Sequence, residues 1–275
     1  APLESELETF EVQHPISTLV FLLDGPLRNI PMSFLIDSQG TYLIEKYPVA
    51  VISSRQLFSQ NNRQNRSKLL LAGITESRTF PEVGTLSALP AVENELSTIT
   101  ATLQQTEEPL LNELFTRGQL ETKIDSNNYS IVHIATHGEF NSDPVRTFIM
   151  AWDQLIKFRD FADVLQVGQG DSNRSIDLLV LSACKTANGD RRAALGLAGA
   201  AAQANVRTTL ATLWTVDDRA TAEFMSQFYT HLQAGMTIAQ AVQKTQLSFL
   251  DKSGGELDYR RPYYWAPFII VGNWN

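Results

Sequence analysis

IVHIATHG (residues 131–138) and LLVLSACKTANG (residues 178–189) are the two stretches of sequence that decide the fold. In each, a run of aliphatic and β-branched residues stops abruptly at small, polar or glycine residues. Continuous apolar runs of this length are typical of strands covered on both faces, as in a parallel sheet. Parallel strands end at one edge of their sheet, and α/β proteins bind their ligands at that edge. The sequence therefore predicts that His137 and Cys184, each at the end of such a run, meet there.

Apolar runs alternate with amphipathic segments along the rest of the chain, which indicates an α/β fold with a right-handed, mostly parallel sheet flanked by helices. The polar residues 59–68 contain no apolar side chain and predict a boundary or an exposed linker. We expect further strands at 17–25, 42–54, 68–74, 147–152, 207–214 and 266–272 and helices at 91–105, 116–124, 155–165, 194–204, between Asp217 and Gly235, and at 237–250.

Composition excludes several classes of protein. A length of 275 residues is enough to bury a large core. The net charge of −8 argues against nucleic acid as a main partner. The single cysteine excludes an internal disulfide and is typical of a reducing compartment, so we expect a cytoplasmic protein. No apolar run approaches the ~20 residues of a membrane helix, and the first ten residues lack the features of a signal peptide.

A thiol and an imidazole at one sheet edge can serve as nucleophile and base. Most lone cysteines are small buried hydrophobic residues, but Cys184 follows its apolar run and the next residues, 185–189, are mainly polar. That setting favours a nucleophile. Gly138, next to His137, allows a substrate to approach closely. The backbone N–H groups of Gly138 and Cys184 are the candidates for stabilising an oxyanion.

His133 lies four residues before His137 and raises the possibility of a metal site. Residues four apart on a strand share a face but lie about 13 Å apart, which is too far for two ligands of one zinc ion with bonds of about 2 Å. His133 is therefore predicted to be a core histidine, and no metal or cofactor is expected. Glu139 and Asp143 are near enough in sequence to orient His137, but a backbone carbonyl can do the same. We therefore predict a Cys–His dyad.

Six segments taken together make the chain resemble the CHAT domain, a caspase- and separase-related cysteine peptidase domain often found behind tetratricopeptide repeats in bacteria, notably cyanobacteria. They are LVFLLDGPLRNIPMSFL, YLIEKYPVAV, IVHIATHGEF, LLVLSACKTANGDRRAALGLAGAAAQA, TLATLWTVDDRATAEFMSQFYTHL and RPYYWAPFIIVGNW. The resemblance covers about residues 17–275. The histidine and cysteine of the family fall on His137 and Cys184, and caspases also place the histidine about 50 residues before the cysteine.

The resemblance implies a caspase-like fold in which residues 1–60 form a degenerate half that supports an active half at residues 68–275. It also implies a cysteine endopeptidase that cleaves a specific protein substrate. An N-terminal region, of tetratricopeptide repeats or another sensor, would regulate it as a partner within a longer protein.

The S1 pocket of caspase-like folds lies beside the strand that follows the cysteine strand. Here that strand ends near Trp214, so the pocket candidates are Trp214, Thr215, Asp217 and Asp218. The related separases have acidic residues in a similar segment and cut after arginine, so the resemblance implies a basic P1 residue, most simply Arg. The alternative is that Asp217 and Asp218 only cap the following helix.

Two other functions remain open. The first is a catalytically silent scaffold of CHAT type that binds a protein partner, against which the presence of His137 and Cys184 argues. The second is a flavodoxin-like domain that binds a nucleotide or another small molecule. This interpretation lacks a glycine-rich phosphate loop, because GLAGAAAQA follows the cysteine turn and is typical of a closely packed helix, not of G-x-G-x-x-G after a strand.

Overall fold

The computed structural model describes residues 2–25, 27, 30–52, 68–140, 146–166, 175–186, 201, 204, 206–252 and 258–275. The predicted linker at 59–68 lies outside this part except for Lys68. The predicted helix at 194–204 also lies outside it, except for Ala201 and Ala204.

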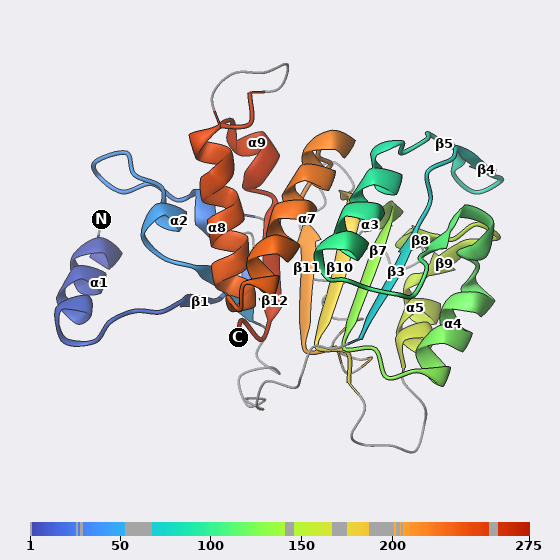
Figure 1. Cartoon of the computed structure of the whole chain (residues 1–275). Helices are drawn as coiled ribbons and strands as arrows, with labels where there is room; N and C mark the ends of the chain where they lie inside the picture. Colours follow the sequence, from blue (N-terminus) through green and yellow to red (C-terminus); the bar gives the residue numbers. More distant parts are fainter. Residues whose placement is uncertain are drawn as a thin grey trace.

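A ten-stranded sheet forms the centre of the described molecule (Figure 1). Most neighbouring strands are parallel, as predicted, and antiparallel pairing is confined to the eighth, ninth and last strands. The path through the sheet is β1 (Leu19–Leu22), β2 (Val49–Ile52), β12 (Phe268–Gly272), β11 (Thr208–Thr212), β10 (Leu178–Thr186), β7 (Ile131–Phe140), β3 (Leu69–Gly73) and β6 (Leu110–Leu111), with β8 (Phe148–Met150) beside β7 and β9 (Leu155–Lys157) beside β8. A separate hairpin joins β4 (Arg78–Phe80) to β5 (Gly84–Leu86).

Helices cover both faces of this sheet (Figure 1). One face packs against α3 (Ala91–Thr102), α7 (Asp218–Gln233) and α8 (Ile238–Asp251), and the other against α4 (Arg117–Ser126) and α5 (Phe158–Leu165). The remaining helical segments are α1 (Pro2–Gln13), α2 (Leu43–Lys46), α9 (Pro262–Trp265) and the 3-10 turns η2 (Met32–Phe34) and η3 (Asn112–Leu114).

Strand β7 is buried on both faces. Its residues Ile131 and Ala135 belong to the core beneath α3, α7 and α8, whereas Val132 and Ile134 belong to the core beneath α4 and α5. Side chains alternate along a strand, so a central strand covered on both sides needs an uninterrupted apolar run. This burial is the physical origin of the apolar run in the sequence.

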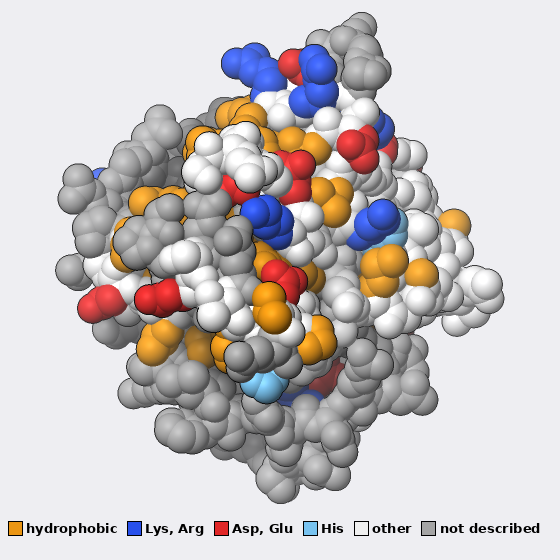
Figure 2. Space-filling model, turned by 90° about the vertical axis from the view of Figure 1, so that its left-hand side faces the viewer, with side chains coloured by type: hydrophobic (Ala, Val, Ile, Leu, Met, Phe, Trp, Pro, Cys, Tyr) orange, Lys and Arg blue, Asp and Glu red, His pale blue; other side chains and the backbone are white. Residues whose placement is uncertain are grey.

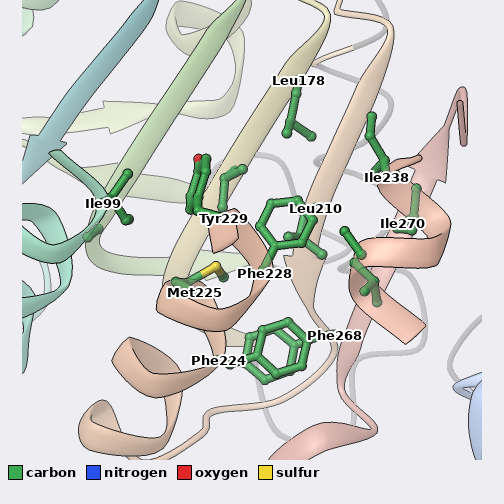
Figure 3. Close-up of a cluster of buried hydrophobic side chains, with 14 of the residues drawn as sticks. Ile99, Leu178, Leu210, Phe224, Met225, Phe228, Tyr229, Ile238, Phe268 and Ile270 are labelled. Atoms are coloured by element: carbon green, nitrogen blue, oxygen red, sulfur yellow. The ribbon is translucent and has the colours of Figure 1, made fainter. Parts of the chain in front are cut away.

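Aromatic side chains attach α7 to the sheet (Figure 3). Phe224 of α7 stacks on Phe268 of β12, with ring centroids 3.6 Å apart and ring planes at 7°. Phe228 and Tyr229 follow one helical turn later and are also fully buried. The helical period places these residues on one side of α7, so the start of this helix is fixed over the carboxyl end of the sheet.

Two predicted elements differ from the structure. The stretch 42–54 was expected to be extended, but Leu43–Lys46 forms the helical turn α2, because the side chain of Glu45 accepts a hydrogen bond from the backbone N–H of Tyr42 at 2.7 Å. The helix expected at 155–165 begins only at Phe158, since residues 155–157 pair with β8 as strand β9.

The N-terminal strands join the same sheet as the rest of the chain. β2 lies between β1 and β12, and Val51 is paired with Val271. The division into a supporting region at 1–60 and an active region at 68–275 stays a prediction. Hydrophobic side chains reach the surface on this side of the molecule between polar ones (Figure 2). The exposed hydrophobic residues of the N-terminal part include Leu22, Leu27 and Ile36. No helix in the described residues combines the length and hydrophobicity needed to cross a membrane.

Gly73, at the end of β3, allows α3 to pack closely on the sheet. A Cβ at this position would lie 2.7 Å from Val92 Cγ1 and 2.9 Å from Leu96 Cδ1, both on α3. We predict that Gly73→Ala lowers the free energy of unfolding by about 1–3 kcal/mol through overpacking. The matched control is Gly118→Ala in α4, where a Cβ meets nothing within 4 Å and alanine should stabilise the helix by about 0.5–1 kcal/mol. Urea denaturation of both variants measures the difference, and equal midpoints would contradict the prediction.

Candidate active site

The parallel pairing of β7 with β10 brings the two predicted catalytic positions together. The strands run in register from Ile131 and Leu178 to Ala135 and Ser182. The next paired positions are Gly138 and Cys184. The backbone of Cys184 therefore lies directly beside Gly138, one residue from His137. The side chain of Cys184 lies outside the part of the chain that the structure describes.

A β-bulge lies at this point in the pairing. Between the two registered pairs, β7 contributes Thr136 and His137, whereas β10 contributes one residue. The Thr136 hydroxyl donates to the carbonyl of Met150 at 2.9 Å, and the His137 ring contacts the carbonyl of Ser87, which precedes α3. Bulges of this kind re-aim side chains next to active sites. His137 lies on the α3 side of the sheet, as do Ile131, His133 and Ala135 by strand alternation. The extra residue of β7 brings Gly138 into register with Cys184.

Both strands continue a few residues beyond the predicted positions. β7 extends to Phe140 and β10 to Thr186, so His137 and Cys184 lie within the last part of each strand. The sequence predicted that the strands end at His137 and Cys184, and the structure shows that they end two or three residues later. The extension follows from the pairing of Gly138 and Glu139 with β8, which prolongs β7.

The contact with Ser87 fixes the tautomer of His137. Nε2 of the ring lies 2.7 Å from the Ser87 carbonyl oxygen. A carbonyl oxygen only accepts hydrogen bonds, so Nε2 carries the proton and donates. In the neutral ring, Nδ1 is then the nitrogen with a free lone pair. Nδ1 is therefore the atom that can take a proton from a thiol.

Two hydrogen bonds hold the segment that carries Ser87. The N–H of Leu89 donates to the carbonyl of Thr75 at 2.9 Å, just after β3. The N–H of Ala91, the first residue of α3, donates to Oδ2 of Asp218 at 2.8 Å. The position of the Ser87 carbonyl is thus tied to β3 and to the start of α7.

His133 is a core histidine, as predicted. It is fully buried, with Nε2 at 2.9 Å from Glu95 Oε1 and Nδ1 at 3.1 Å from the Tyr229 hydroxyl. Burial raises the pKa of Tyr229 well above its usual value, and the charge of Glu95 raises it further. The phenol therefore stays protonated and donates to Nδ1, while Nε2–H donates to Glu95.

The pocket candidates after β11 have distinct environments. The indole Nε1 of Trp214 donates to the carbonyl of Tyr263 at 3.0 Å, and Thr215 is exposed. Asp217 is the N-cap of α7, since its Oδ1 accepts from the N–H groups of Arg219 at 3.0 Å and Ala220 at 3.2 Å. Asp217 therefore caps the helix that follows it, α7, as the alternative interpretation of the sequence expected. Asp218 instead accepts from the first N–H of α3.

Asp218 is an acidic group close to His137. Burial raises its pKa. The hydrogen bond from Ala91 lowers the pKa, the carboxylates of Glu95 and Asp217 raise it, and the charge of His137 lowers it. Its Oδ1 is buried and has no hydrogen-bond partner among the described residues. One carboxylate oxygen thus holds α3 and the other is available to a further donor.

Other sequence candidates are not brought to the ring. No hydrogen bond joins Glu139 to His137 among the described residues, and Asp143 lies outside them. Within the same part of the chain, no three His, Cys, Asp or Glu side chains are grouped so that they could hold a metal ion.

The model of the CHAT domain family matches residues 1–273, almost the whole chain. The chain belongs to the CHAT domain family. Among curated proteins no match was found.

Solved structures similar to this CHAT domain include the cysteine proteinase gingipain R and a caspase. The complex of the pro- and mature domains of Porphyromonas gingivalis RgpB shares 9% identity at a TM-score of 0.59 and covers 98% of this chain and 68% of its own. The Arg-specific cysteine proteinase gingipain R aligns at 9% identity and a TM-score of 0.60, covering 99% and 67%. Caspase-1 from Spodoptera frugiperda aligns at 9% identity and a TM-score of 0.45, covering 76% and 87%. The family match together with the likeness to the two RgpB structures shows that the CHAT domain has the fold of these caspase-like cysteine peptidases.

Sequence reasoning missed Ser87 and Glu95. Ser87 contributes only its backbone carbonyl, which every residue has, so no side-chain signal was present. Glu95 did carry a signal, because it lies on the buried side of α3 with Val92, Leu96 and Ile99. A carboxylate within an apolar helical stripe indicates a buried partner.

We predict that Asp218→Asn makes the CHAT domain more stable at neutral pH. Because the folded state raises the pKa of Asp218 above its ordinary value of 3.8, the wild type loses stability as pH rises through and above that value. An asparagine keeps an oxygen for Ala91 N–H and does not ionise. Urea denaturation should therefore show the higher midpoint for Asp218→Asn at pH 7 and a smaller gap below pH 3.8.

The control variant is Asp218→Ala, which removes the charge and also the acceptor for Ala91. It should be about 1 kcal/mol less stable than Asp218→Asn because the N–H at the start of α3 loses its partner. If the urea midpoints of wild type and Asp218→Asn differ by the same amount at every pH, the raised pKa of Asp218 is not the cause of the difference and the prediction is contradicted.

Proposed function

We propose that this CHAT domain is a cysteine endopeptidase in which Cys184 is the nucleophile and His137 the base. The observation that carries the proposal is the bulged pairing of β7 with β10, which sets the backbone of Cys184 beside Gly138 and next to His137. The caspase-like fold and the Nε2–H tautomer of His137 support it.

In the first step, Nδ1 of His137 takes the thiol proton and the sulfur attacks the scissile carbonyl carbon. A C–S bond forms, and the carbonyl oxygen becomes an oxyanion. The backbone N–H groups of Gly138 and Cys184 stabilise this oxyanion; the loss of one such donor typically costs about 3 kcal/mol.

In the second step, the C–N bond breaks as His137 gives its proton to the leaving amine. A water molecule then attacks the thioester, with His137 again as the base. The C–S bond breaks, the carboxylate product leaves and the thiol regains its proton. Each cycle consumes one water and one peptide bond, and no cofactor takes part.

The substrate side chain that precedes the scissile bond is basic in this proposal, most simply Arg. Asp217 and Asp218 lie at the start of α7, after the strand next to β10, together with Trp214 and Thr215. Oδ1 of Asp218 is a buried acceptor without a partner among the described residues. A guanidinium group is a planar donor that matches a carboxylate.

The family resemblance and the composition support a proposal for the physiological setting. We place the domain in the cytoplasm, where a single reduced cysteine is stable. A sensor region, such as tetratricopeptide repeats, would regulate the peptidase within a longer protein. The direct partner of the CHAT domain itself would be a specific protein substrate.

We predict that Cys184→Ala abolishes peptide cleavage and that His137→Ala lowers kcat/KM by about 10²–10⁴. Labelling by a peptidyl electrophile ending in Arg, followed by intact mass measurement, should detect one adduct in the wild type and none in Cys184→Ala. His231→Ala is the matched histidine control, since His231 lies on α7 outside the proposed site, and its activity should be unchanged. Full activity of Cys184→Ala would reject the mechanism; a folded wild type that neither cleaves nor labels would favour the silent scaffold.

The predicted P1 preference needs a separate test. Peptides that differ only in P1 should show kcat/KM for Arg at least about tenfold above a neutral residue of similar length, because hydrogen bonds to charged groups contribute about 1.5–3 kcal/mol. Asp218→Asn should reduce this ratio, and Asp258→Asn, an exposed carboxylate paired with Arg260, should leave it unchanged. Equal cleavage after Arg and neutral residues would reject the pocket assignment.

A further inference from the structure

Three polar contacts connect α3, α7 and β7 in a closed triangle. Glu95 of α3 joins His133 of β7, and His133 joins Tyr229 of α7. Asp218 of α7 joins the N–H of Ala91 at the start of α3. We name these contacts the polar triangle. Each side links two of the three elements, so none of them can shift without breaking at least two contacts.

The His133 corner of the triangle is sealed from solvent. The exposed fractions of His133, Glu95 and Tyr229 are 0%, 1% and 0%. Figure 3 shows Tyr229 pointing from α7 toward the sheet. The three side chains are surrounded by apolar neighbours of the α3–α7 core, such as Ile99 and Met225.

This arrangement is an inefficient way to stabilise a core. Glu95 Oε2 and the hydroxyl of Ser182, on the neighbouring strand β10, are buried without hydrogen-bond partners among the described residues. Burying polar groups that are only partly satisfied costs free energy, and apolar residues of similar volume often serve stability equally well. A buried polar network that is only partly hydrogen-bonded is therefore better explained by a role other than stabilising the fold.

The triangle lies next to the parts that orient His137. His133 is on the same strand as His137, and both ring systems contact groups on the α3 side of the sheet. Ser87, whose carbonyl fixes the His137 tautomer, lies four residues before Ala91. The distance between Nε2 of His137 and that carbonyl therefore depends on where α3 sits relative to β7.

We propose that Glu95, His133 and Tyr229 are positioning residues, which hold α3 against β7 so that the Ser87 carbonyl keeps His137 in the Nε2–H tautomer. They touch no substrate and act through Ser87 and His137. The effect on turnover rests on the proposed peptidase function, whereas the effect on the tautomer does not.

The test measures the tautomer of His137 and the kinetics in the same variants. The chain has four histidines, so ¹⁵N-histidine labelling gives few imidazole signals, and a His137→Gln spectrum assigns the one needed. The double variant Glu95→Leu/His133→Leu replaces both buried partners with apolar groups and keeps the core filled. Tyr229→Phe removes only a hydroxyl and keeps the ring. Thr245→Val is the control, since it removes another buried hydroxyl, which donates within α8 to Ala241.

In wild type and Thr245→Val, we expect the Nε2–H tautomer of His137 and equal kinetics. In the double variant the Nε2–H signal should give way to a mixture of tautomers, and kcat should fall about ten- to a hundredfold with KM within about twofold, because misplacement by about 1 Å can cost a hundredfold. Tyr229→Phe should show a smaller change in the same direction. Glu95→Gln, which keeps an acceptor for His133, should restore both properties to near wild type.

An unchanged His137 tautomer in both the double variant and Tyr229→Phe would overturn the proposal. If the double variant does not fold, Tyr229→Phe decides by the same two measurements. If wild type shows no peptidase activity at all, the tautomer measurement still decides about the positioning residues, so the two failures can be told apart.

Discussion

The pairing of β7 with β10 is the constraint on which the site depends. Parallel strands hold their backbones about 4.8 Å apart, so two residues in register cannot move away from each other without breaking the sheet. Here the register places Cys184 beside Gly138. The bulge adds one residue to β7 between the two pairs and so brings Gly138 into register with Cys184, while strand alternation places the imidazole of His137 on the side of the sheet occupied by α3. The closeness of the backbone of Cys184 to Gly138 and His137 is thus a consequence of strand pairing.

The strands that are buried on both faces could be predicted from the sequence, whereas short elements at other places were predicted less well. Runs such as LLLAG and FIIVG gave strands β3 and β12, because continuous burial demands continuous apolar residues. Short elements were misjudged where a neighbour decides the conformation. Leu43–Lys46 is helical through the cap by Glu45, and Leu155–Lys157 is a strand because β8 is beside it. The pairing with β8 is not visible in a local pattern, and the cap by Glu45 was missed because Tyr42, at the N-cap, is not one of the residues that usually signal a helix start.

The candidate site shows the same dependence on strands. The places of His137 and Cys184 after apolar runs predicted that their positions lie close together, and the pairing of β7 with β10 brings them there, whereas their catalytic role stays a prediction. The Ser87 carbonyl was not found, because a backbone acceptor leaves no trace in residue type. Similarity to gingipain R at 9% identity has the same explanation: the fold is preserved by the pattern of buried positions, and few individual residues need to agree.

The last strand has a place in the sheet that affects how the chain assembles. β12, residues Phe268–Gly272, is inserted between β11 and β2 and runs antiparallel to β11. Among the described residues, β1 and β2 are therefore connected to the rest of the sheet through β12, a strand far from them along the chain. Contacts between such distant parts of a chain slow folding. A stretch of β1 and β2 made early in synthesis thus stays without its neighbour in the sheet until β12 has been made, and the two ends of the sheet are closed by a contact that is distant along the chain.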